Sequence, residues 1–362
     1  MNNILFVCHK INSQLTKSLP NYIIPIKFSY KIKSHRNIIS GVQKIISAAL
    51  QNKVIHIIII FNTDSRFIHE LLKIKESKNI DIPISALIWK SKNYKINILK
   101  KLENILSYSS NYLYSQYVKS HQIDTVLLKK IKYLPWPSFL DDKKVNILKS
   151  LPISDYFFSG GDNKRDYLTL IESFINLPYR LIIATNCRFF SGKKCLKSGY
   201  ITGEVGKTIS KFIKLDKIQK GYVTYDSFIT EMLLKYNKKS IDNITILYNV
   251  SLDKYHELLA KSYAYIHAIK DPITGFSSLS EAIHLSKPII AINTTSITDS
   301  LQHNHNSLLI NSSVHEYQQA CKLLKNDIDF RNDLSQNMSH ISYQRSFSYY
   351  NKFILDITNQ KI

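Results

Sequence analysis

Cysteine, glycine and proline are all scarce in this chain of 362 residues, and their scarcity excludes several classes of protein. The four cysteines, at positions 8, 187, 195 and 321, form no CxxC pair, which argues against a structural zinc site. So few cysteines are typical of reduced thiols in the cytosol, where a disulfide between Cys187 and Cys195 would be exceptional. Nine glycines and nine prolines argue against a fibrous or linker-rich protein.

Long apolar runs are also missing. The longest aliphatic runs, such as residues 57–61, are far shorter than the roughly 20 residues that a membrane-spanning helix needs. The opening residues, MNNILFVCHK, lack the basic segment and the small-residue cleavage site of a signal peptide, so they predict a first β-strand. We therefore expect a cytoplasmic protein.

Acidic residues are absent from residues 1–50, and the whole chain carries a net charge of +22. Residues 1–150 hold 24 Lys and Arg against 8 Asp and Glu, whereas the remainder holds 25 against 19. Such a field attracts a polyanion, which could be nucleic acid, an anionic membrane surface or an acidic lipid-linked substrate. No known nucleic-acid-binding motif accompanies the charge, so we expect no nucleic acid, although a non-catalytic basic protein that binds it remains an alternative.

A stripe of apolar residues with helical spacing lies in this basic half, beside Lys95, Lys100 and Lys101. Its members are Ile98, Leu99, Leu102, Ile105 and Leu106. A helix of this kind can rest on an anionic bilayer or pack into the core of its domain. With either placement, the net charge leads us to expect peripheral association with the inner face of the plasma membrane.

Strand-like apolar runs alternate with helical patterns along both halves of the chain. The alternation predicts an α/β protein with parallel sheets, and the length suits two domains. Two prolines, Pro135 and Pro137, and the charged residues 141–144 indicate a boundary between them. We predict an N-terminal domain over 1–148, a C-terminal domain over 149–342, and a last helix within 343–362 that returns towards the first domain. Residues 187–242 show no clear pattern.

The first motif with a chemical meaning is FSGGDNKRD, at residues 158–166, between a predicted strand and a predicted helix. Gly160 and Gly161 would let backbone N–H groups approach an anion closely. The following helix points its positive end at the same place, where Lys164 and Arg165 could grip a diphosphate. The alternative is an ordinary strand-to-helix turn with solvated charges.

The second motif is DPITGFSSLSEAI, at residues 271–283, which is followed by KPII at 287–290. A predicted strand ends just before it, and a helix carries Glu281. Ligands of open α/β sheets bind at such carboxyl ends of strands, where a carboxylate can accept the hydroxyl hydrogens of a ribose. The alternative is a surface glutamate near a helix start.

Taken together, the two motifs resemble those of the family 4 glycosyltransferases, which have the GT-B fold. SGGDNKRDYLTLIESF resembles the donor-phosphate strand, turn and helix of that family, and TGFSSLSEAIHLSKPII resembles its glutamate signature. NVSLDKYHELLAKSYAYIHA and TDSLQHNHNSLLI resemble the segments before and after that signature. The resemblance covers roughly residues 132–340, with a gap over 187–242, and implies two Rossmann-like domains facing each other across a cleft.

The resemblance also assigns roles by position. Glu281 would bind the donor ribose, and Arg165 takes the place of the phosphate-binding lysine of the family. The backbone at Gly160 and Gly161 would serve where an arginine is often found. Three residues at a helix start would lie beside the diphosphate, with a diphosphate-sized gap between Arg165 and that helix; they are Phe276, Ser277 and Ser278.

Two positions depart from the family pattern. Ile273 stands where many members have a second glutamate, and Asp271 is the nearest acid that could substitute for it. No clear N-terminal histidine faces the sugar, so His9, after the first strand, is our catalytic candidate together with Asp271, and Lys90 is another candidate. No metal site is expected: Asp327-Ile-Asp329 spells an acidic metal-binding triplet but lies between predicted C-terminal helices.

The sequence thus predicts a glycosyltransferase that moves a sugar from a nucleotide-sugar donor to a glycan or lipid-linked acceptor, in cell-surface polysaccharide synthesis. The resemblance implies a hexosyltransferase that retains the anomeric configuration and needs neither a metal nor another cofactor. Within the same fold, a sugar epimerase with the same ribose glutamate is the alternative.

Overall fold

The computed structural model describes most of the chain, and every structural statement below concerns the described residues. They are residues 3–9, 21, 23–28, 35–60, 65–88, 96–120, 125–161, 165–185, 242–248, 250–270 and 276–359.

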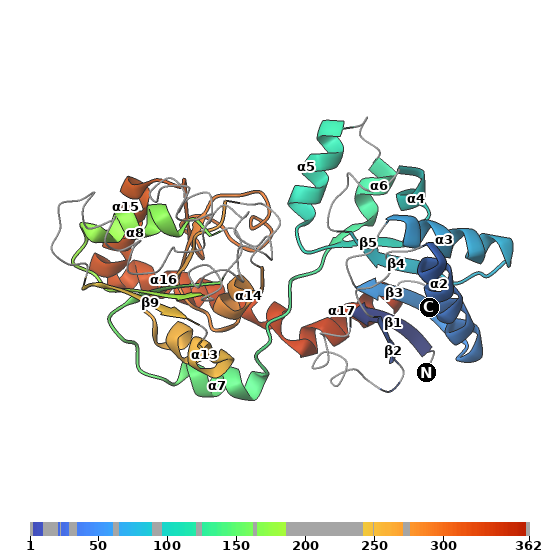
Figure 1. Ribbon diagram of the computed structural model, residues 1–362, viewed down its shortest axis with the longest axis horizontal. Helices are drawn as coiled ribbons and strands as arrows, with labels where there is room; N and C mark the ends of the chain where they lie inside the picture. Colours follow the sequence, from blue (N-terminus) through green and yellow to red (C-terminus); the bar gives the residue numbers. More distant parts are fainter. Residues whose placement is uncertain are drawn as a thin grey trace, which may run out of the picture. The chain divides into compact units, whose positions relative to one another are not determined.

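The chain divides into two compact units (Figure 1). Unit 1 comprises Met1–Phe139 together with Phe347–Ile362, and unit 2 comprises Leu140–Ser346. The division falls before helix α7 (Asp142–Lys149), earlier than the boundary predicted at 148, because α7 packs against α13 (Leu252–Lys261) of unit 2. Asp141 caps α7 by accepting a hydrogen bond from the Lys144 backbone N–H at 2.7 Å.

Unit 1 is built on one parallel sheet of six strands in the order β2-β1-β3-β4-β5-β6. Ile57 and Ile59 of β3 point to one face of the sheet, whereas Ile58 and Ile60 point to the other, as the two-residue period of a strand requires. The strands are β1 (Asn3–His9), β2 (Ile23–Phe28), β3 (Val54–Ile60), β4 (Ile84–Leu87), β5 (Asn104–Ser107) and β6 (Ile131–Tyr133).

Helices cover both faces of this sheet. One face packs against the five helices α2 (His35–Gln51), α3 (Ser65–Ser77), α4 (Ile96–Lys100), α5 (Ser110–Ser120) and α6 (Thr125–Lys130). The other face packs against α17 (Phe347–Asn359), whose Tyr350, Ile354 and Ile357 are buried on it. The Tyr350 hydroxyl also donates a hydrogen bond to the Pro135 carbonyl oxygen, so a helix from the end of the sequence completes the core of unit 1.

The predicted apolar stripe around residues 98–106 is not one helix, and this part of the prediction was wrong. Ile98 and Leu99 belong to the short helix α4, whereas Ile105 and Leu106 lie in strand β5. All five stripe residues are buried in the core of unit 1. The stripe therefore offers no apolar face to a bilayer.

Unit 2 is built on a second parallel sheet of six strands, in the order β12-β11-β10-β7-β8-β9. These strands are β7 (Phe157–Gly160), β8 (Leu181–Thr185), β9 (Ile244–Tyr248), β10 (Ala264–His267), β11 (Ile289–Ile292) and β12 (Leu308–Ile310). Buried on both faces, such strands show continuous apolar sequence rather than alternation.

Two layers of helices enclose this second sheet (Figure 1). Helices α8 (Tyr167–Ile175) and α15 (Val314–Asn326) lie on one face, and α7, α13 and α14 (Phe276–His284) lie on the other. Helix α16 (Ile328–Ser342) contributes Leu334 to the first layer and Met338 to the second. The short 3-10 helix η4 (Tyr343–Arg345) follows α16. The predicted α/β class with two parallel sheets is confirmed.

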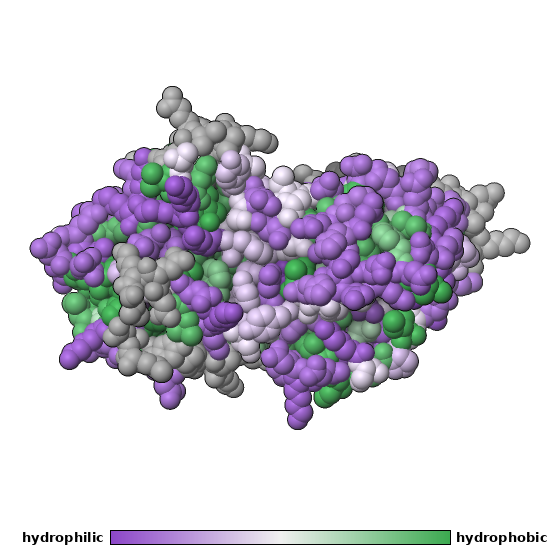
Figure 2. All heavy atoms as spheres, turned by 180° about the vertical axis from the view of Figure 1, so that it is seen from behind, coloured by the Kyte–Doolittle hydropathy of each residue, from purple (hydrophilic) through white to green (hydrophobic). Residues whose placement is uncertain are grey.

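Hydrophilic side chains make up most of one face of the molecule (Figure 2). In the face seen in Figure 2, hydrophilic residues predominate and hydrophobic ones gather in small groups. Among the described residues, no helix combines the length and the apolar character needed to cross a bilayer.

Candidate functional site

The carboxyl ends of β7 and β10 mark the place in unit 2 where the strand order reverses. From β7 the chain adds β8 and β9 on one side, and then returns to place β10, β11 and β12 on the other. Connections leaving these two neighbouring strands run to opposite sides, which opens a crevice for ligands in parallel sheets. Gly160 ends β7 and His267 ends β10, so both predicted motifs reach this point.

Arg165 is the central cation of the site. Its backbone forms a bridge with Ile269, and the following N–H of Asp166 donates to the Ala268 carbonyl at 2.8 Å, which ties the segment to the end of β10. The guanidinium is buried, with only 2% of the residue exposed. Its Nη2 donates to Ser278 Oγ at 2.6 Å.

His267 also contacts this guanidinium. The Nη1 of Arg165 lies 3.3 Å from His267 Nδ1. Burial, and then the adjacent charge of Arg165, lower the pKa of His267 well below its ordinary value. The imidazole is therefore neutral near pH 7, and its Nδ1 can accept the hydrogen bond.

Glu281 lies on α14, three residues after Ser278, so the two side chains share one face of the helix. The glutamate is buried, with 4% of the residue exposed, and its Oε1 lies 3.1 Å from His256 Nε2 of α13. The structure thus brings Arg165, Ser278 and Glu281 together at the carboxyl edge of the sheet. A guanidinium and a carboxylate in this arrangement can bind a phosphate at one end and sugar hydroxyls at the other.

The two glycines serve a different purpose from the one predicted. The Gly161 N–H donates to the Ala184 carbonyl at 3.0 Å, so this amide belongs to the sheet and is not directed at a ligand. Gly161 has φ +116°, and a Cβ there would lie 2.4 Å from Arg165 Nη2. A Cβ at Gly160 would lie 2.4 Å from the Tyr255 ring. Glycine is required here because Arg165 and Tyr255 pack directly on the backbone.

The predicted gap between Arg165 and the start of α14 was also wrong. The 2.6 Å contact between Arg165 and Ser278 leaves no space for a diphosphate between those two groups. A phosphate that reaches Arg165 must displace the serine hydroxyl or approach the guanidinium from another side. Phe276 and Ser277 form the first turn of α14 and are half-buried.

Asp166 anchors the turn that carries Arg165. Its carboxylate forms an ion pair with Lys270 at 2.6 Å and accepts hydrogen bonds from the Ser312 hydroxyl and, at 3.0 Å, from Thr169. Burial alone would raise the pKa of this carboxyl, but the hydrogen bonds from Lys270, Ser312 and Thr169 outweigh it and hold the pKa below its usual range. One carboxylate thus joins three segments that border the site.

Four predicted site residues lie wholly or partly outside the described residues. Lys164 and Asp271 are among the residues not described, as is Lys90. His9 ends β1, and β1 and β3 are the neighbours at which the strand order of the first sheet reverses. The backbone of His9 therefore occupies the equivalent position in unit 1, while its side chain is outside the described part.

The sequence did not single out Tyr255, His256 or His267. Tyr255 is partly buried and packs against Gly160 and Phe158, and the burial of its hydroxyl raises the pKa of that group well above the ordinary value. A signal existed for His267, because it is the polar residue that ends a buried strand next to the switch point. No comparable signal marks His256, which reaches Glu281 from another helix.

Comparison with known proteins identifies the fold. No protein-family model and no curated protein sequence matches the chain. Among solved structures, a glycosyltransferase from Rickettsia africae matches with TM-score 0.65 at 13% identity, covering 99% of this chain and 98% of the other. HepE from Anabaena, solved with UDP, matches with TM-score 0.64 at 12% identity over 99% and 100%.

A third similar structure belongs to a protein assigned as a UDP-N-acetylglucosamine 2-epimerase, from Listeria monocytogenes. It matches with TM-score 0.54 at 9% identity, over 100% of this chain and 98% of the other. Likeness over whole chains at so low an identity is a likeness of fold. The chain therefore has the GT-B fold, as the two motifs predicted.

Proposed function

We propose that this protein is a glycosyltransferase whose unit 2 binds a nucleotide-sugar donor at the carboxyl ends of β7 and β10. The observation that carries the proposal is the convergence of Arg165 and Glu281 at this switch point, each delivered by a separate motif. Arg165 would bind the diphosphate together with the positive end of α14, and Glu281 would accept hydrogen bonds from the ribose.

The solved relatives support a uridine nucleotide as the first donor to test, because HepE was solved with UDP. In this proposal the diphosphate charge is met by Arg165 and the α14 N-terminus, so the transfer needs no metal ion. Asp271 and His9 are the candidates for groups near the transferred sugar, and Lys164 for a further phosphate contact. Retention of the anomeric configuration follows from the family resemblance.

We further propose that the acceptor is a glycan or an acidic, lipid-linked glycan bound by unit 1, with a role in cell-surface polysaccharide synthesis. The support is the charge of residues 1–150, where Lys and Arg outnumber acids three to one. The same charge would hold the protein at the inner face of the plasma membrane without any inserted helix. Flotation with anionic liposomes should show binding that fades as salt rises, because screening shortens the reach of exposed charges.

The donor site is tested by thermal unfolding of the protein with UDP-, GDP-, ADP-, CMP- and dTDP-sugars. A true donor at one hundred times its Kd should stabilise the protein by about 2.7 kcal/mol, or roughly 5–11 °C in Tm. Glu281→Ala should weaken donor binding by about 1–3 kcal/mol through the lost charged hydrogen bonds.

Glu257→Ala is the matched control for Glu281→Ala. Glu257 is an acid on α13 that forms surface ion pairs with Lys254 and Lys261, so its loss should leave donor binding unchanged. The proposal fails if no nucleotide-sugar raises Tm, or if both glutamate variants bind the donor as well as the native protein.

An epimerase is the second candidate, because one similar structure is assigned to that activity. The two activities differ in their need for an acceptor. A transferase should move a labelled sugar onto glycan or glycolipid, whereas an epimerase should change the sugar stereochemistry of the donor in the absence of any acceptor. NMR of the sugar product with and without acceptor separates them.

A further inference from the structure

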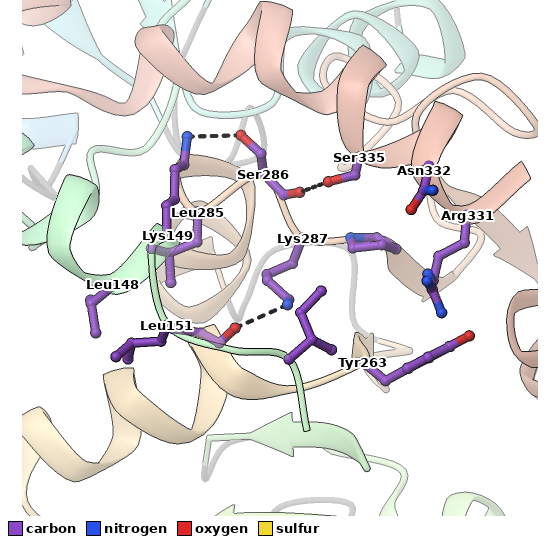
Figure 3. Close-up of a pocket in the computed structure, with 13 residues that line it drawn as sticks. Leu148, Lys149, Leu151, Tyr263, Leu285, Ser286, Lys287, Arg331, Asn332 and Ser335 are labelled. Atoms are coloured by element: carbon purple, nitrogen blue, oxygen red, sulfur yellow. Dashed lines mark hydrogen bonds between the residues drawn. The ribbon is translucent and has the colours of Figure 1, made fainter. Parts of the chain in front are cut away.

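A polar cavity lies in unit 2, at the edge of the sheet opposite the candidate donor site (Figure 3). It encloses about 260 Å³. Its lining includes Tyr263, which immediately precedes β10, and Pro288, which immediately precedes β11. Since all strands of this sheet are parallel, the cavity borders their amino ends, whereas Arg165 and Glu281 are at the carboxyl ends.

Three cations line this cavity, and none of its thirteen lining residues is Asp or Glu. Lys149 comes from the end of α7, Lys287 from the turn after α14, and Arg331 from the first turn of α16. Burial lowers the pKa of all three, that of Lys287 to about 8. Of the three, only Lys287 is buried, whereas Lys149 is exposed and Arg331 is partly buried, so the cost of desolvating a cation with no carboxylate in the lining falls on Lys287, and an anion in the cavity would offset it.

The donors of these cations are held by neutral groups. Lys149 Nζ donates to Ser286 Oγ at 2.9 Å, and Lys287 Nζ donates to the Ala260 carbonyl at 3.0 Å. The Arg331 guanidinium lies 4.0 Å from the centre of the Tyr263 ring. Each ammonium has three N–H donors, so these bonds leave donors that can turn to a ligand.

The wall of the cavity is fixed by contacts between its helices. Ser286 has the left-handed φ of +54°, and its carbonyl accepts a hydrogen bond from Ser335 Oγ at 2.6 Å. The bonds from Lys149 and Ser335 thus join α7, the turn after α14 and α16 at one residue (Figure 3). A preformed polar site of this kind loses little conformational entropy when it binds.

We propose that this cavity is a binding site for a small phosphate monoester, of the size of a sugar phosphate. An arginine fork and two lysine point charges are the side chains that proteins use for phosphate. The volume lies just below the range of pockets for drug-sized ligands, which suits a small metabolite. Tyr263 and Leu285 supply apolar wall for the carbon portion. The site is independent of the donor site and of the proposed transferase activity.

The test is isothermal titration of the full chain with glucose 6-phosphate at constant ionic strength, with glucose and citrate as comparison ligands. The native protein should bind the phosphate ester, and neither comparison ligand should match it. Arg331→Gln and Lys149→Gln should each weaken binding about tenfold or more, as expected for a lost charged hydrogen bond. Two variants are used so that, if one of them does not fold, the other still tests the proposal.

Lys325→Gln is the matched control. Lys325 also lies near Tyr263, with Nζ 4.7 Å from the ring centre, but it does not line the cavity, so its loss should leave the affinity unchanged. The proposal is overturned if glucose 6-phosphate does not bind, if glucose or citrate binds equally well, or if the folded Arg331 and Lys149 variants bind like the native protein. Loss of binding in Glu281→Ala alone would place the phosphate ester in the donor site and would equally overturn it.

Discussion

Arg165 and Asp166 are consecutive residues of opposite charge, and the fold buries both of them at the same turn. They do not neutralise each other through their assigned contacts: Arg165 contacts Ser278 and His267, while Asp166 binds Lys270 and Ser312. These contacts show that the two residues have different roles. Asp166 fixes the turn to the neighbouring segments, and Arg165 faces the first turn of α14.

Asp166→Asn should therefore lower the free energy of unfolding by about 1–3 kcal/mol, because the buried acceptor loses its charge. Since the pKa of Asp166 is lowered in the folded protein, its contribution is present above the unfolded pKa of about 3.9. That contribution disappears as pH falls through the folded pKa, so the native protein and the variant should converge in strong acid. Urea unfolding at several pH values measures both effects.

Asp155→Asn is the control for this prediction. Asp155 is an exposed acid paired with Lys325, so the same substitution should change the free energy of unfolding by less than about 1 kcal/mol. An equal decrease in the free energy of unfolding in the two variants would show that the buried contacts of Asp166 add nothing to stability.

Only the site residues that belong to a recognisable sequence motif could be predicted. Glu281 and Arg165 stand in recognisable local patterns, and both are in the site. The sequence does not show why glycine occupies positions 160 and 161. The side chains that pack on Gly160 and Gly161 are those of Tyr255, about ninety-five residues later in the chain, and of Arg165. For the same reason His256 was missed: its partner Glu281 is supplied by a different helix.

At the scale of elements, residues 96–107 show how one apolar spacing fits two structures. The spacing predicted a continuous helix, but the chain ends α4 at Lys100 and enters β5 at Asn104. Lys130 stabilises the carboxyl end of α4 because its ammonium group donates hydrogen bonds to the Lys100 and Leu102 carbonyl oxygens, both at 2.7 Å. Short apolar runs cannot be assigned by period alone, and here the deciding contact comes from thirty residues away.

Ile105→Ala should lower the free energy of unfolding by about 2–5 kcal/mol, since Ile105 is fully buried between the sheet and its helices. Val126→Ala is the control, because Val126 is 61% exposed and its loss should change stability by less than about 0.5 kcal/mol. Urea unfolding of both variants distinguishes a core strand from a surface stripe. A small effect at Ile105 would restore the membrane-facing interpretation.

The long elements of both sheets were predictable, because their buried strands are uninterrupted apolar runs and their helices show a clear apolar face. The short strands β2 and β6 and the short helix α6 were not predicted. Strand β6 and helix α6 contain too few residues to display a period, whereas β2 is longer but contains Pro25, which argues against a strand; pairing with neighbouring strands specifies β2 and β6.

At the scale of the whole molecule, the core of unit 1 depends on a helix that follows unit 2 in the sequence. Tyr350 and Ile354 are fully buried on the sheet by α17. Ile354→Asp should destabilise unit 1 by about 3–5 kcal/mol or more, because the charge would be buried without a partner. The expected readout is a lower urea midpoint and a smaller soluble fraction.

Lys352→Asp introduces the same acid one half-turn away, at an exposed position of α17. It should leave both readouts nearly unchanged, within about 0.5 kcal/mol. If the two variants behaved alike, α17 would be dispensable for the core of unit 1.

This placement of α17 has a consequence for the order in which the protein is made. The strands of unit 1 leave the ribosome first, yet residues 140–346 must be synthesised before the helix that covers one face of their sheet. At a translation rate of about 5–20 residues per second, that face of the sheet stays uncovered for roughly 10–40 seconds. During this interval the nascent chain exposes a broad apolar surface that includes Ile58 and Leu106, which is the kind of surface that chaperones bind. Unit 1 thus begins to be translated before unit 2 but can complete its core only after unit 2 has been synthesised.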